Sequence, residues 1–332
     1  MTEWSGKHAV AVAHPNIALA KYWGKLAQGT NLPAVPSLSL TLAGMSTRTE
    51  VRIDDALEGD RLTLDGHAVE GRPLARVSQL LDLVWAGAGT RSGRRPPAMV
   101  VSTNDFPTAG GLASSASAFA ALAVAADGAL GTGHSIDELS SLARAVSASA
   151  GRSLFGGFVE LPAGVAGEMR LSARALAPVD HWPLRLLVAV TAEGPKAVGS
   201  TEGMIHTVAT SPYFDAWVAW APQAFERIRQ AVLARDLDAL GPLVEQSALA
   251  MHATAMASDP GLLYWNGATL DVIHAVRRLQ GRGLAAYFTI DAGPHVKVVT
   301  LADQVNVITA ALTRVPGVRR VITTCPGGPA RL

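Results

Sequence analysis

Three segments of the chain carry side chains that together suit phosphoryl transfer. Asp291 lies in an apolar run, 287–294, that delivers one carboxylate into a turn. Far upstream, Lys21 and Lys25 supply two ammonium groups, and between the two regions lies a segment rich in glycine and serine, 107–117. A base, two cations and a loop able to hold phosphate are the parts that an ATP-dependent enzyme needs.

The glycine- and serine-rich segment follows a predicted strand, 99–103, and precedes a predicted helix, 115–130. A strand, a glycine-rich turn and a helix in this order direct backbone N–H groups and a helix N-terminus toward one point, which favours an anion. Neither of the common nucleotide patterns, G-x-x-x-x-G-K-[ST] and G-x-G-x-x-G, occurs. Taken alone, the segment is equally compatible with a small-residue helix start packed closely on a sheet.

Lysine is rare in this chain and falls mostly within these motifs. The lysines are Lys7, Lys21, Lys25, Lys196 and Lys297, and the other basic residues are arginines. A lysine ammonium is a compact point charge and a common phosphate ligand. An arginine-biased composition could leave single lysines by chance, but the pair formed by Lys21 and Lys25 favours phosphate binding.

Hydrophobic periodicity predicts the elements that position these residues. In the first half, strands are predicted at 9–13, 37–42, 48–53, 61–64, 99–103 and 158–161, with a hairpin turn at Asp65-Gly66. Helices are predicted at 72–85, at 115–130, and from a capping box at Ser135 toward residue 150.

The pattern restarts near Trp182-Pro183. Strands are predicted at 184–190, 285–290, 295–299 and 318–323. Helices are predicted at 237–257, 268–280 and 302–313, and from a Ser211-Pro212 start to about residue 235. The pattern is α+β with mixed sheets, not a regular βαβ array. We expect two lobes, 1–183 and 184–332.

Composition limits the class of protein. The chain has 332 residues, of which 49% are hydrophobic and 17% charged, which is typical of a globular protein with a large core. A net charge of +1 gives no footprint for nucleic acid, and one cysteine, Cys325, excludes an internal disulfide framework. No secretory h-region is visible at the N-terminus, and the apolar run 118–126 is far shorter than the roughly 20 residues of a membrane span. We therefore expect a soluble, cytoplasmic protein with no membrane partner.

Several motifs resemble those of the diphosphomevalonate decarboxylases, a family within the GHMP kinase superfamily. Segment 107–117 resembles the phosphate loop P-x-x-x-G-L-[GA]-S-S-A, with Ala113 in the form typical of this family. The resemblance continues in chain order through segments 16–25, 147–158, 200–204, 210–212 and 291–297. It departs from the family pattern at Pro15, Ala148, Gly151 and His295, and none of these changes removes a charged group.

The resemblance implies a GHMP kinase fold, with an N-terminal lobe like domain 2 of ribosomal protein S5, a ferredoxin-like C-terminal lobe and an active site in the cleft between them. It implies ATP-dependent decarboxylation of (R)-5-diphosphomevalonate to isopentenyl diphosphate, ADP, phosphate and CO₂, by way of 3-hydroxyl phosphorylation, in the mevalonate pathway of isoprenoid and lipid biosynthesis. It also implies ATP and Mg²⁺ as cofactors and a homodimer.

The resemblance assigns roles to individual residues. Asp291 accepts the hydroxyl proton, Lys21 pairs with it, and Arg152 holds the substrate carboxylate. The implied substrate-binding residues are Tyr22, Trp23, Gly24, Lys25, Arg76, Ser147, Ala148, Ser149, Ala150, Gly151, Arg152, Thr201 and Met204. The implied nucleotide-binding residues are Asn104, Gly110, Gly111, Leu112, Ala113, Ser114, Ser115, Ser117 and Lys196, with Ser115 also reaching Mg²⁺ through ATP.

Structural roles remain open for some of these residues. Asp291 and Asn104 suit ordinary turns, and Arg76 suits a solvated helix face. Thr201 suits a helix N-cap, and Met204 suits a core position. The nine histidines show no spacing typical of zinc ligands, so zinc is not expected.

Alternative functions also remain open. They are decarboxylation of 5-phosphomevalonate, a mevalonate 3-kinase that stops after phosphorylation, and a non-catalytic GHMP protein that binds its ligands and acts through a partner. The combination of Asp291, Lys21 and Arg152 favours full decarboxylation, because a 3-kinase could dispense with part of it. A non-catalytic relative should have lost the base or the loop serines, and this chain retains them.

Overall fold

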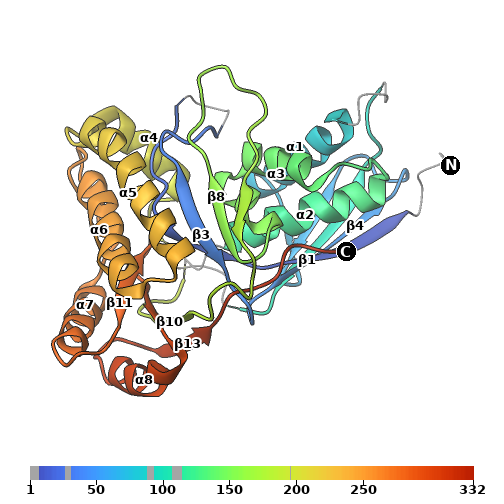
Figure 1. Ribbon diagram of the computed structural model, residues 1–332. Coiled ribbons are helices and arrows are strands. Elements are labelled where there is room, and N and C mark those ends of the chain that lie inside the picture. The colour runs from blue at the N-terminus through green and yellow to red at the C-terminus, as the bar shows by residue number, and fades with distance from the viewer. Residues whose placement is uncertain (1–6, 27–30, 88–92, 107–113, 195) are drawn as a thin grey trace.

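The computed structural model describes residues 7–26, 31–87, 93–106, 114–194 and 196–332. Within these ranges the chain forms three sheets with helices packed on them (Figure 1). This is the two-lobed α+β architecture that the sequence predicts. None of the helices in these ranges is both long enough and apolar enough to cross a membrane.

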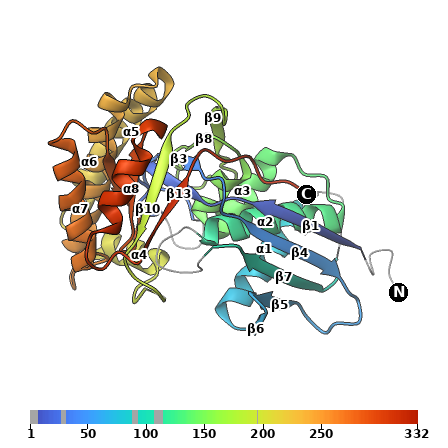
Figure 2. The ribbon, with the colours of Figure 1, turned by 90° about the horizontal axis from the view of Figure 1, so that it is seen from below.

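The first sheet supplies one wall of the N-terminal lobe. Its strands lie in the order β1 (His8–Ala13), β4 (Thr47–Ile53), β7 (Ala98–Asn104), β5 (Arg61–Leu64) and β6 (His67–Val69). Helices α1 (Arg72–Gly87), α2 (Ser114–Leu130) and α3 (Ile136–Val146) cover one face of it (Figure 2). The alternating strand residues Val51, Ile53 and Val100 bury against the alanine-rich face of α2, where small side chains allow close approach.

The second sheet belongs to the first half of the chain but packs against helices of the second half. Its order is β2 (Asn16–Ala20), β3 (Ser37–Thr41), β8 (Phe158–Leu161) and β9 (Arg174–Ala177). Helices α5 (Phe214–Ala234) and α6 (Leu237–Met256) share one core with it. The two lobes are therefore joined by a continuous hydrophobic core, which holds the end of β2 against α6.

The third sheet forms the C-terminal lobe, in the order β11 (Tyr287–Ile290), β12 (Val296–Thr300), β10 (Arg185–Val190) and β13 (Arg320–Thr324). Helices α7 (Gly267–Gln280) and α8 (Val305–Thr313) cover one face. Along β10, Leu187 and Ala189 face these helices, whereas Leu186 and Val188 face the core shared with the second sheet. Burial on both faces explains why this strand is wholly apolar after Arg185.

The C-terminal segment returns to the N-terminal lobe (Figure 1). The backbone N–H of Val12 donates to the carbonyl of Arg331 at 2.8 Å, and the N–H of Gly327 donates to the carbonyl of Thr41 at 2.8 Å. Residues 326–331 therefore complete a lobe built mainly from the first half of the sequence. The expected boundary at 183/184 stays a prediction, and the lobes are not two consecutive, independent stretches.

Most predicted elements are present, with ends shifted by a few residues, and the Ser135 capping box is confirmed. Two helix limits were wrong. The helix expected from Ser211 begins at Phe214. The backbone of Ser211 ends the preceding helix, and its hydroxyl donates to the carbonyl of Thr254 at 2.7 Å and accepts from the N–H of Tyr213 at 3.3 Å. The helix expected toward residue 150 ends at Val146 and is followed by a 3-10 helix, Ala148–Leu154. The elements absent from the prediction are β2, β6, β9 and α4 (Ser200–Thr210).

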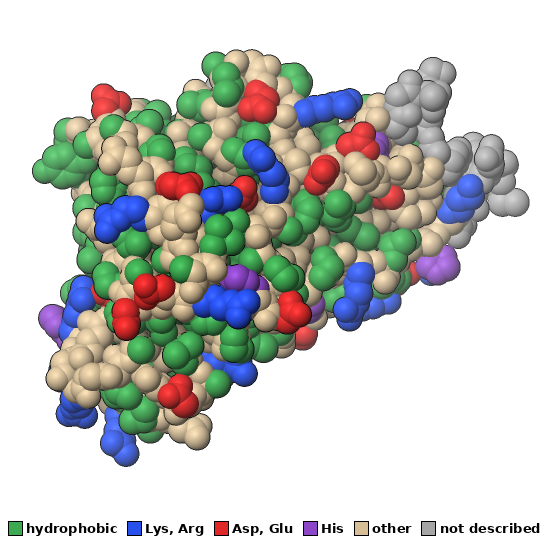
Figure 3. Space-filling model, viewed as in Figure 1, with side chains coloured by type: hydrophobic (Ala, Val, Ile, Leu, Met, Phe, Trp, Pro, Cys, Tyr) green, Lys and Arg blue, Asp and Glu red, His purple; other side chains and the backbone are tan. Residues whose placement is uncertain are grey.

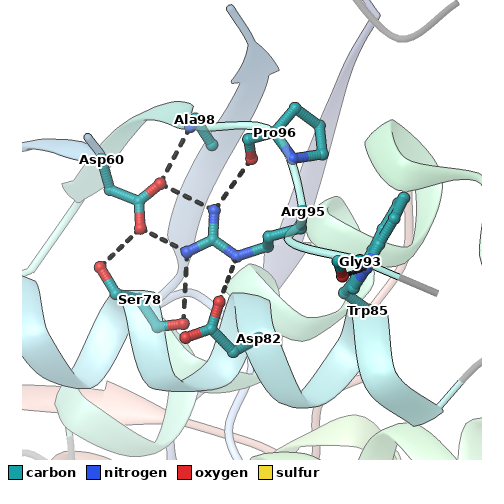
Figure 4. Close-up of polar contacts among 8 residues, drawn as sticks. All are labelled: Asp60, Ser78, Asp82, Trp85, Gly93, Arg95, Pro96 and Ala98. Carbon is teal, nitrogen blue, oxygen red and sulfur yellow. Dashed lines mark hydrogen bonds and ion pairs between the residues drawn. The ribbon is translucent and has the colours of Figure 1, made fainter. Parts of the chain in front are cut away.

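A buried ion pair holds α1 against the first sheet (Figure 4). The guanidinium of Arg95 contacts both carboxylate oxygens of Asp60, and its Nε lies 2.7 Å from Oδ1 of Asp82 on α1. Asp60 also accepts from the Ser78 hydroxyl at 2.6 Å and from the backbone N–H of Ala98 at 2.9 Å. The pair thus joins the residue before β5, helix α1 and the start of β7.

Replacing Arg95 by Met should reduce the free energy of unfolding by about 3 kcal/mol, because the buried Asp60 carboxylate would lose its counter-charge. Urea denaturation followed by circular dichroism measures this loss. The matched control is Arg319→Met, which removes an ion pair between exposed side chains, Arg319 and Glu193. Equal losses in the two variants would contradict the structural role of the Arg95 pair.

Candidate active site

A cleft of about 670 Å³ lies between the lobes, a size typical of small-molecule sites. Its charged lining has six cationic side chains against three carboxylates, namely Lys21, Lys25, Arg72, Arg76, Arg152 and Lys196 against Asp65, Glu202 and Asp291. On the outer face shown in Figure 3, basic and acidic side chains are interspersed. The excess of positive charge in the cleft suits an anionic ligand.

Two strands far apart in sequence bring Asp291 and Lys21 together. Lys21 directly follows β2, and Asp291 directly follows β11. The Lys21 Nζ donates to Oδ1 of Asp291 at 2.5 Å and to the carbonyl of Ala18 at 3.0 Å. The backbone N–H of Lys21 donates to the hydroxyl of Ser247 on α6 at 2.9 Å, which fixes the end of β2. The predicted pair is therefore present at the wall of the cleft.

A second lysine reaches the same carboxylate. The Nζ of Lys297, on β12, lies 3.3 Å from Oδ2 of Asp291. Burial alone would raise the pKa of Asp291, but the charges of Lys21 and Lys297 overcome it and hold that pKa well below its usual range. Burial lowers the pKa of Lys21 to about 8, although Asp291 opposes the shift. Asp291 is thus ionised at neutral pH and faces the cleft.

Arg152 lies in the 3-10 helix, with its guanidinium among polar side chains of the second sheet. Its Nε donates to Oδ1 of Asn16 at 3.2 Å and to the Ser39 hydroxyl at 3.0 Å, and its Nη1 donates to the Ser37 hydroxyl at 2.8 Å. Asn16 in turn donates to the Ser153 hydroxyl at 2.7 Å. These contacts fix the plane of the guanidinium. All three are made by Nε and Nη1, and none is made by Nη2. Burial lowers the pKa of Arg152 to about 10, so the group remains charged near neutral pH.

Two basic side chains, Lys25 and Arg76, line the end of the cleft near α1. Lys25 donates to Oδ1 of Asn31 and, at 3.3 Å, to the hydroxyl of Thr201 on α4. Arg76, on α1, donates to the carbonyl of Val146 at 2.9 Å, and its guanidinium stacks over the ring of Phe119. Arg76 is therefore turned into the cleft and does not lie on a solvated helix face. Burial and the neighbouring arginines lower the pKa of Lys25 to about 8.

Lys196 lies between β10 and α4. Its Nζ donates to the Ser200 hydroxyl and to the carbonyl of Ala292, both at 2.7 Å, and lies over the ring of Tyr264. Burial, followed by the charge of Lys297, lowers the pKa of Lys196 to about 8. Lys196 therefore links the turn after Asp291 to the start of α4.

An apolar compartment adjoins α2. Its walls come from β5, β7, α1 and α2 and are Leu62, Leu64, Val77, Val100, Phe119 and Leu122. Asn104 lies at its edge and accepts from the Thr47 hydroxyl at 2.6 Å. Ser114 and Ser115, at the start of α2, also line the cleft. The predicted nucleotide residues Gly110, Gly111, Leu112 and Ala113 lie outside the described residues.

Most of the remaining predicted site residues line the cleft, namely Tyr22, Trp23, Ser147, Ala148, Ser149, Thr201 and Met204. Gly24, Ala150, Gly151 and Ser117 lie behind it. Gly24 has φ of +99°, and a Cβ there would collide with the ring of Phe214. The Ser117 hydroxyl is buried against Thr47 at 2.7 Å. These four residues support the lining residues of the cleft and do not line it themselves.

The sequence reading assigned no role to four residues that the structure places at the site. Asn16 orients Arg152, Asn31 orients Lys25, Glu202 pairs with Arg72 at 2.9 Å across the mouth of the cleft, and Lys297 contacts Asp291. Lys297 carried a detectable signal, because it is a lysine within the apolar strand V-K-V-V-T. Asn31 carried none, because no local sequence pattern pairs an asparagine with a lysine six residues before it.

In the part of the chain that the structure describes, no three His, Cys, Asp or Glu side chains cluster closely enough to hold a metal ion. The oxygen donors near the start of α2 are the hydroxyls of Ser114 and Ser115. Oxygen donors suit Mg²⁺, which commonly retains water and takes its other ligands from substrate phosphates. The donor set therefore fits Mg²⁺ delivered with a nucleotide.

Comparisons with known proteins agree over both lobes. Residues 13–172 match the diphosphomevalonate decarboxylase-like N-terminal domain, and residues 186–327 match the mevalonate 5-diphosphate decarboxylase C-terminal domain. The chain is 36% identical to the diphosphomevalonate decarboxylase of Candida albicans over 310 residues, covering 90% of this chain and 85% of that protein. It is 36% identical to the human protein of the same name over 314 residues, covering 90% and 78%.

Solved structures are similar over almost the whole chain. Mevalonate diphosphate decarboxylase from Staphylococcus aureus has a TM-score of 0.91 and 35% identity, covering 98% of this chain and 97% of that one. A structure described as "MDDEF in complex with MVAPP, AMPPCP and Magnesium" has a TM-score of 0.90 and 34% identity, covering 98% and 99%. The cleft described above therefore lies in a fold shared with a protein whose structure contains these ligands.

Proposed function

The chain belongs to the diphosphomevalonate decarboxylase family and has its GHMP-type, two-lobed fold; from that premise we propose that it converts (R)-5-diphosphomevalonate and ATP to isopentenyl diphosphate, ADP, phosphate and CO₂. The observation that carries the proposal is the carboxylate of Asp291, which faces the cleft between two lysines. The reaction belongs to the mevalonate pathway of isoprenoid biosynthesis.

The first step is proton transfer from the tertiary 3-hydroxyl of the substrate to Asp291. A carboxylate with a depressed pKa is a weak base, so its contribution comes from position and from an available lone pair rather than from base strength. The hydroxyl oxygen attacks the γ-phosphorus of ATP, and ADP leaves. Lys21 and Lys196, which contact Asp291 and the turn that follows it, stabilise the charge of the transferring group.

The nucleotide occupies the apolar compartment, with its phosphates at the start of α2. Leu62, Val100 and Phe119 offer apolar surface to a base, and the N-terminus of α2 favours phosphate. Ser114 and Ser115 supply hydroxyls, and Ser115 also reaches Mg²⁺. Mg²⁺ bound with the nucleotide would supply positive charge that offsets the charge of the phosphates. Asn104, Lys196 and the loop residues 110–113 complete the expected nucleotide site.

Arg152 holds the C1 carboxylate during fragmentation. The polar network around its Nε and Nη1 fixes the guanidinium plane, so that the fork meets the carboxylate in one orientation. The C3–O bond then breaks toward the leaving phosphate, and the electrons of the C1–C2 bond form the C2=C3 double bond as CO₂ leaves. Ser147 and Ser149, on the same wall, donate hydrogen bonds to the substrate.

Lys25 and Arg76 hold the substrate diphosphate. Replacing Lys25 by Met should raise KM for diphosphomevalonate by about 10- to 100-fold and change kcat much less, since a charge-assisted hydrogen bond to a non-reacting group contributes about 1.5–3 kcal/mol. Steady-state kinetics measure both constants. The control is Lys7→Met, the same substitution at the exposed Lys7. A fall in kcat at unchanged KM would place Lys25 at the reacting centre instead.

The first test of the proposed function is CO₂ release coupled to ADP formation by the purified protein with ATP and Mg²⁺. Diphosphomevalonate, 5-phosphomevalonate and mevalonate are compared side by side. Equal amounts of CO₂ and ADP from the diphosphate alone would support the proposal. ADP without CO₂ would indicate a 3-kinase, and preference for the monophosphate would indicate 5-phosphomevalonate decarboxylation. Stabilisation by ATP and Mg²⁺ without turnover would indicate a non-catalytic binding protein.

Location and assembly are part of the same proposal. A single cysteine favours a reducing compartment, so we place the protein in the cytoplasm. The resemblance to the family favours a homodimer. Light scattering after size-exclusion chromatography tests the assembly, and a mass near the 34.5 kDa of one chain would contradict it.

A further inference from the structure

Lys297 is a fully buried lysine in the centre of the third sheet. Its strand, β12, reads V-K-V-V-T, and every residue of it is buried. Backbone pairing with Val188 on β10 and with Thr289 on β11 fixes its position from both sides. Burying an ammonium group costs several kcal/mol unless a counter-charge compensates it. The position therefore requires an explanation beyond packing.

The counter-charge is the carboxylate that the proposed reaction uses. The Nζ of Lys297 lies 3.3 Å from Oδ2 of Asp291, while Lys21 holds Oδ1 at 2.5 Å. The Asp291 side chain is 23% exposed toward the cleft, and that of Lys297 is 0% exposed. Lys297 thus lies behind the carboxylate. It can affect chemistry in the cleft only by holding Asp291 and by changing the pKa of nearby groups.

The two lysines restrain the carboxylate in different directions. Lys21 comes from the N-terminal lobe and Lys297 from the C-terminal lobe, so each oxygen is held by a different lobe. Rotation of the carboxylate about its Cβ–Cγ bond would break both contacts. Each oxygen keeps a further lone pair for a hydroxyl in the cleft.

The charge around Asp291 is strongly unbalanced. The ionisable groups that face it from the surrounding elements are Lys21 after β2, Lys297 on β12, Arg152 in the 3-10 helix, Lys196 before α4 and His252 on α6. Burial keeps His252 neutral by lowering its pKa to about 3. Lys21, Arg152 and Lys297 are buried cations facing one carboxylate, a net charge of +2 from three positive charges and one negative. That excess of positive charge favours an anionic ligand.

We propose that Lys297 is a positioning residue for the phosphoryl-transfer step: it holds Oδ2 of Asp291 and fixes the plane of the carboxylate toward the substrate hydroxyl. The inference rests on the proposed function. It makes Asp291 the shared counter-ion of two lobes, whose common core keeps both lysines beside the carboxylate. Lys297 itself touches no substrate.

The pKa values of neighbouring groups supply a signature for this role. Lys297 helps to lower the pKa of Asp291 and, after burial, is the main cause of the lowered pKa of Lys196, which is about 8. Without Lys297, the pKa of the carboxylate and that of the ammonium should both rise. A purely structural role would change stability and leave these two pKa values in place.

The test compares wild type with Lys297→Met. The ¹³Cγ signal of Asp291, assigned by its loss in Asp291→Asn, is followed against pH. In the variant its titration midpoint should rise by about 1–3 pH units. The Nζ signal of Lys196, assigned by its loss in Lys196→Met, should titrate near pH 8 in wild type and about one unit higher in the variant. At pH 7, kcat/KM should fall by about 10- to 100-fold with KM for ATP little changed. The control is Thr300→Val, at a fully buried polar position farther along β12; it should leave both midpoints unchanged.

Unchanged midpoints in a folded Lys297→Met protein would overturn the inference, even if the melting temperature falls. If that variant does not fold, Lys297→Gln keeps a polar end beside Oδ2 and should show the same two upward shifts; wild-type midpoints there would also overturn it. Lys297→Arg retains the charge and should keep the carboxylate midpoint near that of wild type. The carboxylate titration requires no turnover, so it tests Lys297 even if the wild-type protein acts on none of the three mevalonate compounds.

Discussion

Replacing Asp291 by Asn should reduce kcat/KM for decarboxylation by about 10⁴-fold, with CO₂ and ADP lost together. The amide has nearly the same shape as the carboxylate but offers no lone pair basic enough to take the hydroxyl proton. It also leaves the ammonium groups of Lys21 and Lys297 facing each other without the intervening negative charge. Coupled assays of ADP and of CO₂ measure both products.

Two measurements separate chemistry from misfolding in Asp291→Asn. Binding of ATP with Mg²⁺, measured by the rise in melting temperature, should persist, because the nucleotide compartment lies on the other lobe. Asp303→Asn removes an exposed carboxylate and should retain wild-type activity. Activity of Asp291→Asn within 10-fold of wild type would contradict the assignment of Asp291 as proton acceptor.

Replacing Arg152 by Gln should reduce CO₂ release by about 10²- to 10³-fold. Removing one partner of a buried charged contact costs about 2–5 kcal/mol, much of it from the charge left unpaired, which here is the substrate carboxylate. ADP formation should fall less than CO₂ release, because phosphorylation at C3 does not break the C1–C2 bond. The ratio of ADP to CO₂ should therefore rise above one.

Two variants of comparable chemistry test the role of Arg152. Arg152→Lys keeps a positive charge but loses the planar fork, so its activity should lie between wild type and Arg152→Gln. Arg144→Gln removes another buried arginine, whose Nε donates to the carbonyl of Leu171 at 3.0 Å, outside the cleft. It should reduce stability while leaving the product ratio at one. Equal loss of ADP and CO₂ in Arg152→Gln would instead assign Arg152 to the phosphoryl-transfer step.

Local sequence signals predicted most elements, because they depend on neighbours within a few residues. The apolar run of β10, the capping box at Ser135 and the turn at Asp65-Gly66 each contain their own physical cause. The start of α5 was misplaced for the opposite reason. Ser211 has the chemistry of an N-cap, but it is also the C-cap of α4, and its hydroxyl is anchored to the carbonyl of Thr254, which is distant in sequence. Local propensity does not report such a distant contact.

The sequence by itself determined the chemical inventory of this protein: a carboxylate in a turn, isolated lysines, an arginine in a small-residue segment and a family of motifs in a particular order. Side-chain type sets which ionisable and hydrogen-bonding groups are available, and folding does not change which side chains are present. Only the tertiary structure decided how these groups combine. Lys21 and Asp291 are separated by 270 positions, and Lys297 contacts the carboxylate because β11 and β12 pair in one register. A shift of that register by one residue would turn Lys297 to the opposite face of the sheet and remove the second cation from the site.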